Sequence, residues 1–277
     1  MDIHELITKV AGYVPQSVKT ALRGQHGAPN RLANIIHAFL NRMPGERYPV
    51  LPCAGRLKGY QMRVDWQIHR AFIYDSWEPE VTQAIDRTAA LGMTAADIGA
   101  QSGFYTLLLS RRVGPQGKVF AFEPLPANYR LLEENLRLNN IENVLVRREA
   151  VADRSGELTF EFPPDKRSLV AGPVLPEDNT GTLSVNCISL DDFVARQEIK
   201  LDLIKMDVEG AEGSVLEGAV NTLQQFHPIL IIELHGAGDQ PRLHPVPVRL
   251  QKMGYTIEWL DERSRTTHIL ARLSPQS

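Results

Sequence analysis

The chain has 277 residues, of which 43% are hydrophobic and 23% charged, as in a globular protein with a sizeable core. No uncharged apolar run approaches about 18 residues, so the sequence predicts no membrane-spanning helix, and its start lacks the pattern of a secretory signal. The net charge of −3 hides an asymmetry, because residues 1–70 carry ten Lys and Arg against four Asp and Glu. Such a basic segment suits an anionic acceptor, a nucleic acid or a membrane surface, or is simply a solvated face.

Residues 1–90 differ from the rest and predict an extension made of helices and a hairpin. Apolar residues recur at helical spacing over 30–43, and a short hairpin is expected around Gly59. A further helix begins at Glu78-Pro79-Glu80, where proline needs no N–H partner. The apolar face of the 30–43 helix must be covered, either by the sheet domain, by a second copy in a homodimer, or as a lid over the acceptor.

Residues 91–277 alternate between apolar strands and amphipathic helices, which predicts an α/β domain with a mostly parallel sheet and helices on both faces. The expected strands are 94–99, 118–123, 144–151, 201–207, 229–234, 255–260 and 267–273, and the expected helices are 104–112, 126–139, 211–226 and 246–253. Only "DERSRTT" separates the last two strands, so they should form an antiparallel hairpin at the sheet edge. The proline-rich segment 163–181 predicts a long surface loop near the crevice, where it would help to select the acceptor.

A glycine turn follows the first strand, in "ADIGAQSGFYT". In a doubly wound sheet, ligands bind beyond the carboxyl ends of the strands. Gly99 and Gly103 give G-x-x-x-G spacing, whereas nicotinamide enzymes use G-x-G-x-x-G to aim a helix at a pyrophosphate. This turn, with Asp97 just before it, suits a cofactor without phosphates whose amino group Asp97 would hold, although a packing turn is the plain alternative.

The second and third strands add further cofactor contacts. Glu123 ends the second strand, about 20 residues after the glycine turn, where a carboxylate accepts hydrogen bonds from a ribose diol and repels a 2′-phosphate. Pro124 then ends that strand. The third strand ends near Ala150, whose backbone would edge an adenine ring.

The fourth and fifth strands carry the densest polar cluster. "LIKMDVEGAE" ends in Asp207, Glu209 and Glu212, and "PILIIELH" ends in Glu233 and His235. Acids crowded at a strand tip repel one another, so such a group indicates a cation, a proton transfer or a helix N-terminus. Asp207 and Glu209 are the functional candidates, and Glu212 is interpreted as a first-turn helix acid.

Four segments, "DIGAQSGFYT", "FEPLPANYRLLEENLRLNN", "LIKMDVEGAE" and "PILIIELH", together resemble the FkbM-type S-adenosylmethionine-dependent methyltransferases. The resemblance covers roughly residues 55–272, with Gln101 where the family usually has Asn. It implies a Rossmann-like seven-stranded class I methyltransferase sheet with an antiparallel C-terminal hairpin, here preceded by the N-terminal helical extension. It further implies O-methylation of hydroxyls on sugars, glycans, glycolipids or polyketide-type natural products, with S-adenosyl-L-methionine as cofactor.

Residues and resemblance together predict where the chemistry lies. The cofactor contacts are expected at Asp97, Gly99, Ala100, Gly103, Tyr105, Glu123, Pro124, Ala150 and Asp207. The catalytic residues are expected to be Asp207, Glu209 and His235. In this hypothesis His235 or Asp207 removes the hydroxyl proton during in-line attack, and Glu209 or Glu233 orients the acceptor or the imidazole.

Several alternatives stay open at this point. Asp207, Glu209, Glu233 and His235 would instead hold a divalent ion that acidifies the hydroxyl, although no ligand spacing demands a metal. A nicotinamide-dependent sugar oxidoreductase or epimerase shares the early strands but needs the missing G-x-G-x-x-G. A nucleic-acid methyltransferase would suit the basic front segment, but aromatic residues are not interleaved with the basic ones there. Cys53 and Cys187 lack zinc-ligand spacing and indicate reduced thiols, so we expect a cytoplasmic protein.

Overall fold

The computed structural model describes residues 50–64, 71–161, 182–236, 241–261 and 266–273. The expected helix over 30–43 and the expected loop over 163–181 lie outside these residues. Among the helices that the structure does describe, none is both long enough and apolar enough to cross a membrane.

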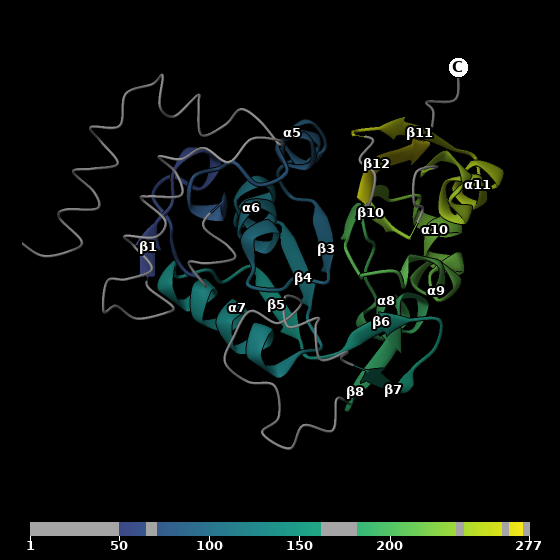
Figure 1. The fold of residues 1–277 in the computed structure, drawn as a ribbon, viewed down its shortest axis with the longest axis horizontal. Helices are drawn as coiled ribbons and strands as arrows, with labels where there is room; N and C mark the ends of the chain where they lie inside the picture. The colour runs from purple at the N-terminus through teal and green to yellow at the C-terminus, as the bar shows by residue number, and fades with distance from the viewer. Residues whose placement is uncertain (1–49, 65–70, 162–181, 237–240, 262–265, 274–277) are drawn as a thin grey trace, which may run out of the picture. The chain divides into compact units, whose positions relative to one another are not determined.

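A seven-stranded sheet forms the centre of the domain (Figure 1). Its strands, in spatial order, are β11 (Tyr255–Trp259), β12 (Thr266–Leu273), β10 (Ile229–His235), β9 (Leu203–Met206), β3 (Thr94–Ile98), β4 (Lys118–Phe122) and β5 (Val144–Arg147). The strands from β10 to β5 are parallel, whereas β12 runs antiparallel to both of its neighbours. The predicted sheet with its antiparallel C-terminal hairpin is therefore confirmed, and β12 lies inside the sheet with β11 at its edge.

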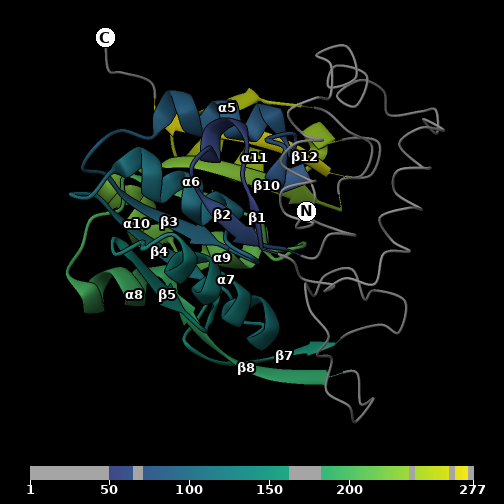
Figure 2. The same ribbon diagram turned by 90° about the vertical axis from the view of Figure 1, so that its left-hand side faces the viewer.

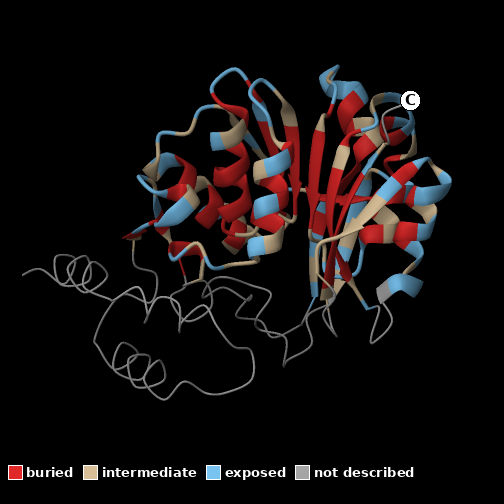
Figure 3. Cartoon of the chain, turned by 90° about the horizontal axis from the view of Figure 1, so that it is seen from above, coloured by how far each residue is buried: buried red, intermediate tan, exposed pale blue. Residues whose placement is uncertain are grey.

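Helices cover both faces of this sheet (Figure 1). One face carries α5 (Pro79–Thr88), α6 (Phe104–Val113) and α7 (Pro126–Leu138), and the other carries α8 (Leu190–Gln197), α9 (Glu212–Glu217), α10 (Val220–Phe226) and α11 (Pro245–Lys252). Buried residues follow the strands and the inner sides of the helices, while the outer sides are exposed (Figure 3). Apolar strand runs covered on both faces are what a parallel sheet requires.

Phe193 of α8 anchors the core between the helices and the sheet. Its ring lies edge-on to Phe120 and Phe122 of β4, at centroid distances of 5.1 and 4.9 Å. Only 1% of Phe193 is exposed, and the surrounding cluster includes strand residues from β3, β9 and β10. This packing holds the central strands, and therefore their carboxyl ends, in a fixed arrangement.

A second, three-stranded sheet continues the chain beyond β5 (Figure 2). It contains β6 (Ala150–Ala152), β8 (Thr182–Ser189) and β7 (Gly156–Glu161), in that spatial order. The single strand predicted over 144–151 is thus two strands in two different sheets. The chain changes sheets at Arg148-Glu149, where the Glu149 carboxylate accepts a hydrogen bond from Arg147.

The segment around Gly59 is fastened to α7. Here β1 (Val50–Pro52) and β2 (Gln61–Arg63) pair antiparallel, with a short 3₁₀ turn at Gly55–Leu57 between them. Asn135 donates to the carbonyl of Arg63 and accepts from its N–H, and Asn139 makes the same pair of bonds with Gln61. Two side chains of α7 therefore pair with the outer backbone groups of β2 and hold this hairpin against the helix.

Two helical predictions need correction. Helix α8 was not expected, although Ser189 caps it by accepting the N–H of Asp192 at 3.1 Å. The helix expected over 211–226 is interrupted at Gly218, where a Cβ atom would lie only 2.0 Å from the carbonyl oxygen of Ala152. Only glycine fits this close approach of β6, and the residues Gly218 and Ala219 lie between α9 and α10.

Replacing Phe193 by alanine tests the core. The Phe193→Ala variant should lose about 3–5 kcal/mol of unfolding free energy, because the rings of Phe120 and Phe122 would line a cavity. Leu91 is 81% exposed, so Leu91→Ala should change stability by no more than about 0.5 kcal/mol. Urea unfolding followed by circular dichroism measures both variants, and equal losses would contradict this account of the core.

Candidate active site

The glycine turn after β3 is pressed against the end of β9. Gly99 has φ +81°, and a Cβ atom there would lie 1.8 Å from the carbonyl oxygen of Asp207. The N–H groups of Gly99 and Ala100 both donate to the carbonyl of Phe122 at 3.0 Å, and the N–H of Asp207 donates to Ile98 at 2.9 Å. Only glycine fits this position, and the turn joins the carboxyl ends of β3, β4 and β9 at one edge of the sheet.

Glu123 lies at this edge, directly after β4, and is 4% exposed. Its carboxylate accepts the N–H of Gln101 at 2.8 Å and the N–H of Leu125 at 2.9 Å. Burial raises the pKa of Glu123 to about 7, although the hydrogen bonds from Leu125, Gln101 and Asn128 oppose that shift. An ionised carboxylate has about four acceptor positions, so capacity remains for a hydroxyl donor beside the glycine turn.

Asp97 and Lys205 form a fully covered charge pair beneath the turn. Asp97 is 0% exposed, accepts the Thr106 hydroxyl at 2.6 Å, and lies beside Lys205 in the register of β3 and β9. Burial raises the pKa of Asp97, whereas Lys205 and Thr106 lower it. Burial lowers the pKa of Lys205, but Asp207 and Asp97 raise it more, so this lysine stays charged. Asp97 thus links β3 to the Thr106 hydroxyl of α6 and lies next to Lys205 of β9. Its other carboxylate oxygen, Oδ1, has no hydrogen-bond partner within the described part of the chain.

His235, at the end of β10, is surrounded by carboxylates. Its Nδ1 atom lies 2.8 Å from Oε1 of Glu212, and its Nε2 atom lies 3.9 Å from Asp207, 3.6 Å from Glu209 and 3.5 Å from Glu233. The structure thus brings together the three predicted catalytic residues. Glu212, interpreted from sequence as a first-turn helix acid, makes the shortest of these four contacts.

These contacts change the protonation of the cluster. Burial lowers the pKa of His235, but the Glu212 hydrogen bond and the surrounding carboxylates raise it to about 9. Burial raises the pKa of Asp207 to about 7, and Glu233 adds to the increase while Lys205 opposes it. Near neutral pH the imidazole therefore carries a proton in the absence of a bound cation, and Asp207 titrates in the same range.

Another histidine, the buried His268, contacts Glu233 from the neighbouring strand β12. His268 of β12 pairs with Glu233 in the sheet register and is 2% exposed. Its Nδ1 atom lies 3.1 Å from Asp261, and its Nε2 atom lies 3.4 Å from both Glu233 and Glu78. Burial lowers the pKa of His268, but Asp261, Glu233 and Glu78 raise it to about 11.

His268 and its neighbours in turn act on Glu233 and Tyr105. Burial raises the pKa of Glu233, but His268, Lys205 and His235 lower it more, to about 2. Tyr105 donates its hydroxyl to Glu78 at 2.5 Å, and its ring lies 4.4 Å from the Lys205 ammonium. Glu78, His268 and Asp261 were not among the predicted site residues, and Glu78 was predicted only as the start of a helix.

The remaining predicted cofactor residues lie close to the same strand ends. Gly103 has φ +92° and precedes the first turn of α6, and Ala100 is buried within the turn. Pro124 is half-buried beside Glu123, and Ala150 is 7% exposed at the start of β6. All of them follow the ends of β3, β4 or β5, where a ligand would cross the sheet edge.

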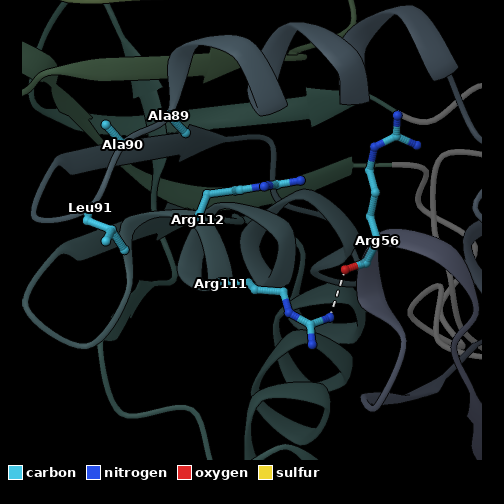
Figure 4. Close-up of a pocket in the computed structure, with 6 residues that line it drawn as sticks. All are labelled: Arg56, Ala89, Ala90, Leu91, Arg111 and Arg112. Atoms are coloured by element: carbon cyan, nitrogen blue, oxygen red, sulfur yellow. Dashed lines mark hydrogen bonds between the residues drawn. The ribbon is translucent and has the colours of Figure 1, made fainter.

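A pocket of about 520 Å³ lies elsewhere, and is lined by Arg56, Ala89, Ala90, Leu91, Arg111 and Arg112 (Figure 4). Residues 89–91 precede β3 and the two later arginines end α6, so the pocket lies by the amino ends of the strands. Arg56 is paired with Asp75 and Asp86, and Arg111 donates to the carbonyls of Arg56 and Lys58. These bonds fasten residues 55–60 to the helices, and the pocket is separate from the polar cluster.

The site's donor atoms also have a spacing that metals accept. Asp207, Glu233 and His235 each offer one atom, all within 4.8 Å of one another, as do Glu78, Glu233 and His268. The charged Lys205 and His268 already neutralise part of both groups.

The family model described as the methyltransferase FkbM domain matches residues 97–257. The chain is 32% identical over 148 residues to the hexuronic acid methyltransferase AglP of Haloferax volcanii, covering 53% of the chain and 57% of that relative. It is 29% identical over 125 residues to the 2-O-methyltransferase NoeI of Sinorhizobium fredii, covering 39% of the chain and 50% of that relative. The chain thus spans 57% and 50% of the length of these two relatives.

Among solved structures, the methyltransferase FkbM from Methylobacillus flagellatus matches with a TM-score of 0.46 and 19% identity, over 65% of this chain and 43% of that one. Fibrillarin from Aeropyrum pernix, solved with bound S-adenosyl-L-methionine, matches with a TM-score of 0.48 and 14% identity, over 82% and 85% of the two chains.

The buried His268 makes stability depend on pH. Its pKa is raised from 6.5 to about 11 in the folded state, so the charged imidazole stabilises fully below pH 6.5 and loses its contribution as the pH rises toward 11. The stability advantage of the wild type over His268→Gln should therefore fall by about 1.4 kcal/mol per pH unit in this window. Urea unfolding at pH 6.5 and 8.5 measures it.

The exposed His227 provides the control for this measurement. A His227→Gln variant should keep the same pH dependence as the wild type. A constant difference between wild type and His268→Gln at the two pH values would contradict a charged His268.

Proposed function

This chain belongs to the FkbM methyltransferase family, and we propose that it transfers a methyl group to a hydroxyl of a sugar, a glycan or glycolipid, or a polyketide-type natural product. The family match confirms the resemblance drawn from the four sequence segments. The cofactor is S-adenosyl-L-methionine, which when bound supplies an electrophilic methyl group on a positively charged sulfur. The single observation that carries the proposal is the carboxylate-lined His235 at the same sheet edge as the Gly99 turn.

The residues at this edge fit such a cofactor. Glu123 has acceptor capacity for a ribose hydroxyl, and the two glycines of the turn, Gly99 and Gly103, carry no side chain beside it. Carboxylates outnumber cations around His235, which suits a positively charged sulfonium and disfavours the pyrophosphate of a nicotinamide cofactor.

The proton of the acceptor hydroxyl must leave as the oxygen attacks, because an alcohol is a weak nucleophile near neutral pH. In this proposal His235 takes that proton, with Asp207 beside it as the alternative base. A positive charge held next to His235 lowers its pKa from about 9, so the neutral imidazole becomes available when the cationic donor is in place. Asp207 and Glu209 then stabilise the imidazolium that forms.

The name of one relative supports a sugar acceptor, and the name of another supports methyl transfer to an oxygen. One is named for a hexuronic acid and the other for 2-O-methyl transfer. In this chain the carboxylates Asp207, Glu209 and Glu233 surround the proposed base. They would repel an anionic group placed next to His235, whereas they do not repel an uncharged hydroxyl. Any anionic group of the acceptor would then lie away from the reacting oxygen.

Cofactor binding is tested by calorimetric titration with S-adenosylmethionine, S-adenosylhomocysteine and NAD. The wild type should bind the two adenosyl ligands and not NAD. Glu123→Gln should weaken that binding about 10- to 100-fold, because a charged acceptor for the ribose is lost. Glu142, which is exposed on the loop before β5, provides the control Glu142→Gln with unchanged affinity. Binding of NAD, or of no ligand, would overturn the proposed function.

The base is tested by His235→Asn, with the exposed His227→Asn as its control. Turnover of an accepted hydroxyl substrate should fall about 10²- to 10⁴-fold in the first variant, because a general base contributes that much, and stay unchanged in the second. S-adenosylhomocysteine should bind both variants as it binds the wild type. If His235→Asn keeps full turnover while a chelator abolishes it, the metal alternative replaces the base.

A further inference from the structure

Glu212 is unusual because its carboxylate is buried although it is the first residue of a helix. It begins α9, where a carboxylate ordinarily faces solvent near the helix N-terminus. Here it is 1% exposed, and its Oε1 atom lies 2.8 Å from Nδ1 of His235 on the neighbouring strand β10. This is the shortest contact that His235 makes with any of its four carboxylate neighbours.

We propose that Glu212 is the positioning residue of the methyl-transfer base, and that it holds the proton of neutral His235 on Nδ1 so that Nε2 faces the acceptor. This inference rests on the proposed function. It assigns Glu212 a role that its sequence position, at the start of a helix, does not suggest.

The backbone before α9 holds the Glu212 carboxylate from the other side. The N–H of Gly210 donates to the same Oε1 atom at 3.0 Å. Glu209 and Gly210 both have left-handed backbone conformations, with φ +52° and +103°, and this reversal aims the Gly210 N–H at the side chain. A carboxylate buried to this extent needs such donors, and the imidazole Nδ1–H is the other donor to it.

The opposite ring nitrogen is left for the acceptor. Nε2 lies 3.9, 3.6 and 3.5 Å from Asp207, Glu209 and Glu233, longer than ordinary hydrogen bonds, whereas the Nδ1 contact has full hydrogen-bond length. Within the described ranges, these three carboxylates and Glu212 are the charged groups that contact His235, from the loop after β9, from β10 and from α9. A histidine fixed at one nitrogen by a buried carboxylate is the arrangement that defines an oriented general base.

Nε2 of neutral His235 accepts the hydroxyl proton while an oxygen lone pair forms the bond to the methyl carbon of S-adenosylmethionine. The carbon–sulfur bond breaks, and its electron pair stays on the sulfur. The products are the methyl ether, the thioether and an imidazolium, whose charge Glu212 stabilises through Nδ1–H.

The variant Glu212→Gln tests the proposal, because a glutamine oxygen still accepts from Gly210 and from Nδ1 but carries no charge. Turnover should fall on the order of 10²-fold at neutral pH, with little change in KM. Because the charged Glu212 raises the pKa of His235, its removal should shift the acid limb of the pH–rate profile to lower pH. Loss of fold alone would not move that limb.

The matched control is Glu217→Gln, which removes an exposed carboxylate from the same helix α9. It should leave turnover and the pH profile unchanged. Thermal unfolding of both variants shows whether the protein stays folded. A third variant, Glu212→Asp, has a shorter side chain but keeps the negative charge. Its turnover should be below that of the wild type, while the acid limb of its pH–rate profile should stay where it is in the wild type.

A readout without turnover separates this inference from the proposed function. In NMR titration, the His235 ring signals, assigned by their loss in His235→Asn, should titrate at lower pH in Glu212→Gln than in the wild type. If the wild type methylates hydroxyl acceptors but Glu212→Gln keeps its rate, its pH profile and its His235 titration, the positioning role is wrong. If the wild type binds no adenosyl ligand, the proposed function fails while the NMR result still tests the Glu212–His235 contact.

Discussion

The close approach of Gly99 to the Asp207 carbonyl is the constraint on which the site depends. With 1.8 Å available to a Cβ atom, no side chain fits between the turn after β3 and the residue after β9. The backbone bonds from Gly99 and Ala100 to Phe122 tie the same turn to β4. Because the turn fixes three strand ends relative to one another, it also fixes the distance between Glu123 on one side and the His235 cluster on the other.

The second organising feature is an excess of buried acid. Asp97, Asp207 and Glu233 all interact with the buried Lys205, Glu233 also contacts His268, and Glu212 contacts the His235 imidazole. Buried charges persist only where they are paired, so this region is stable as long as both histidines can carry protons. An acidic, partly compensated cluster favours a cationic ligand, and in the proposed function the feature that costs stability would favour a sulfonium over a phosphate.

Much of the fold was predictable from residues alone, because each parallel strand is an apolar run and four helices, α5, α6, α7 and α11, begin at a proline or after a glycine. The carboxyl-end acids Glu123, Asp207 and Glu209 followed from the strand pattern in the same way. Helix α8 carried a readable signal, since Ser189 precedes Asp192 with capping-box spacing. The contacts Glu212–His235 and Glu233–His268 were not readable, because they depend on where a helix begins after a left-handed turn and on the register between β10 and β12. Those are tertiary properties that no local pattern encodes.

The position of β12 has a consequence for how the site is assembled during synthesis. Residues 266–273 lie between β10 and β11, so the chain must insert its later strand next to an earlier one before β11 can join the sheet. Until then β10 presents an open edge, and pairing over such a separation is a slow, non-local step. The same insertion brings His268 next to Glu233, so before it Glu233 has Lys205 and His235 as cationic neighbours but not His268. Completion of the sheet and placement of His268 against Glu233 are then one event.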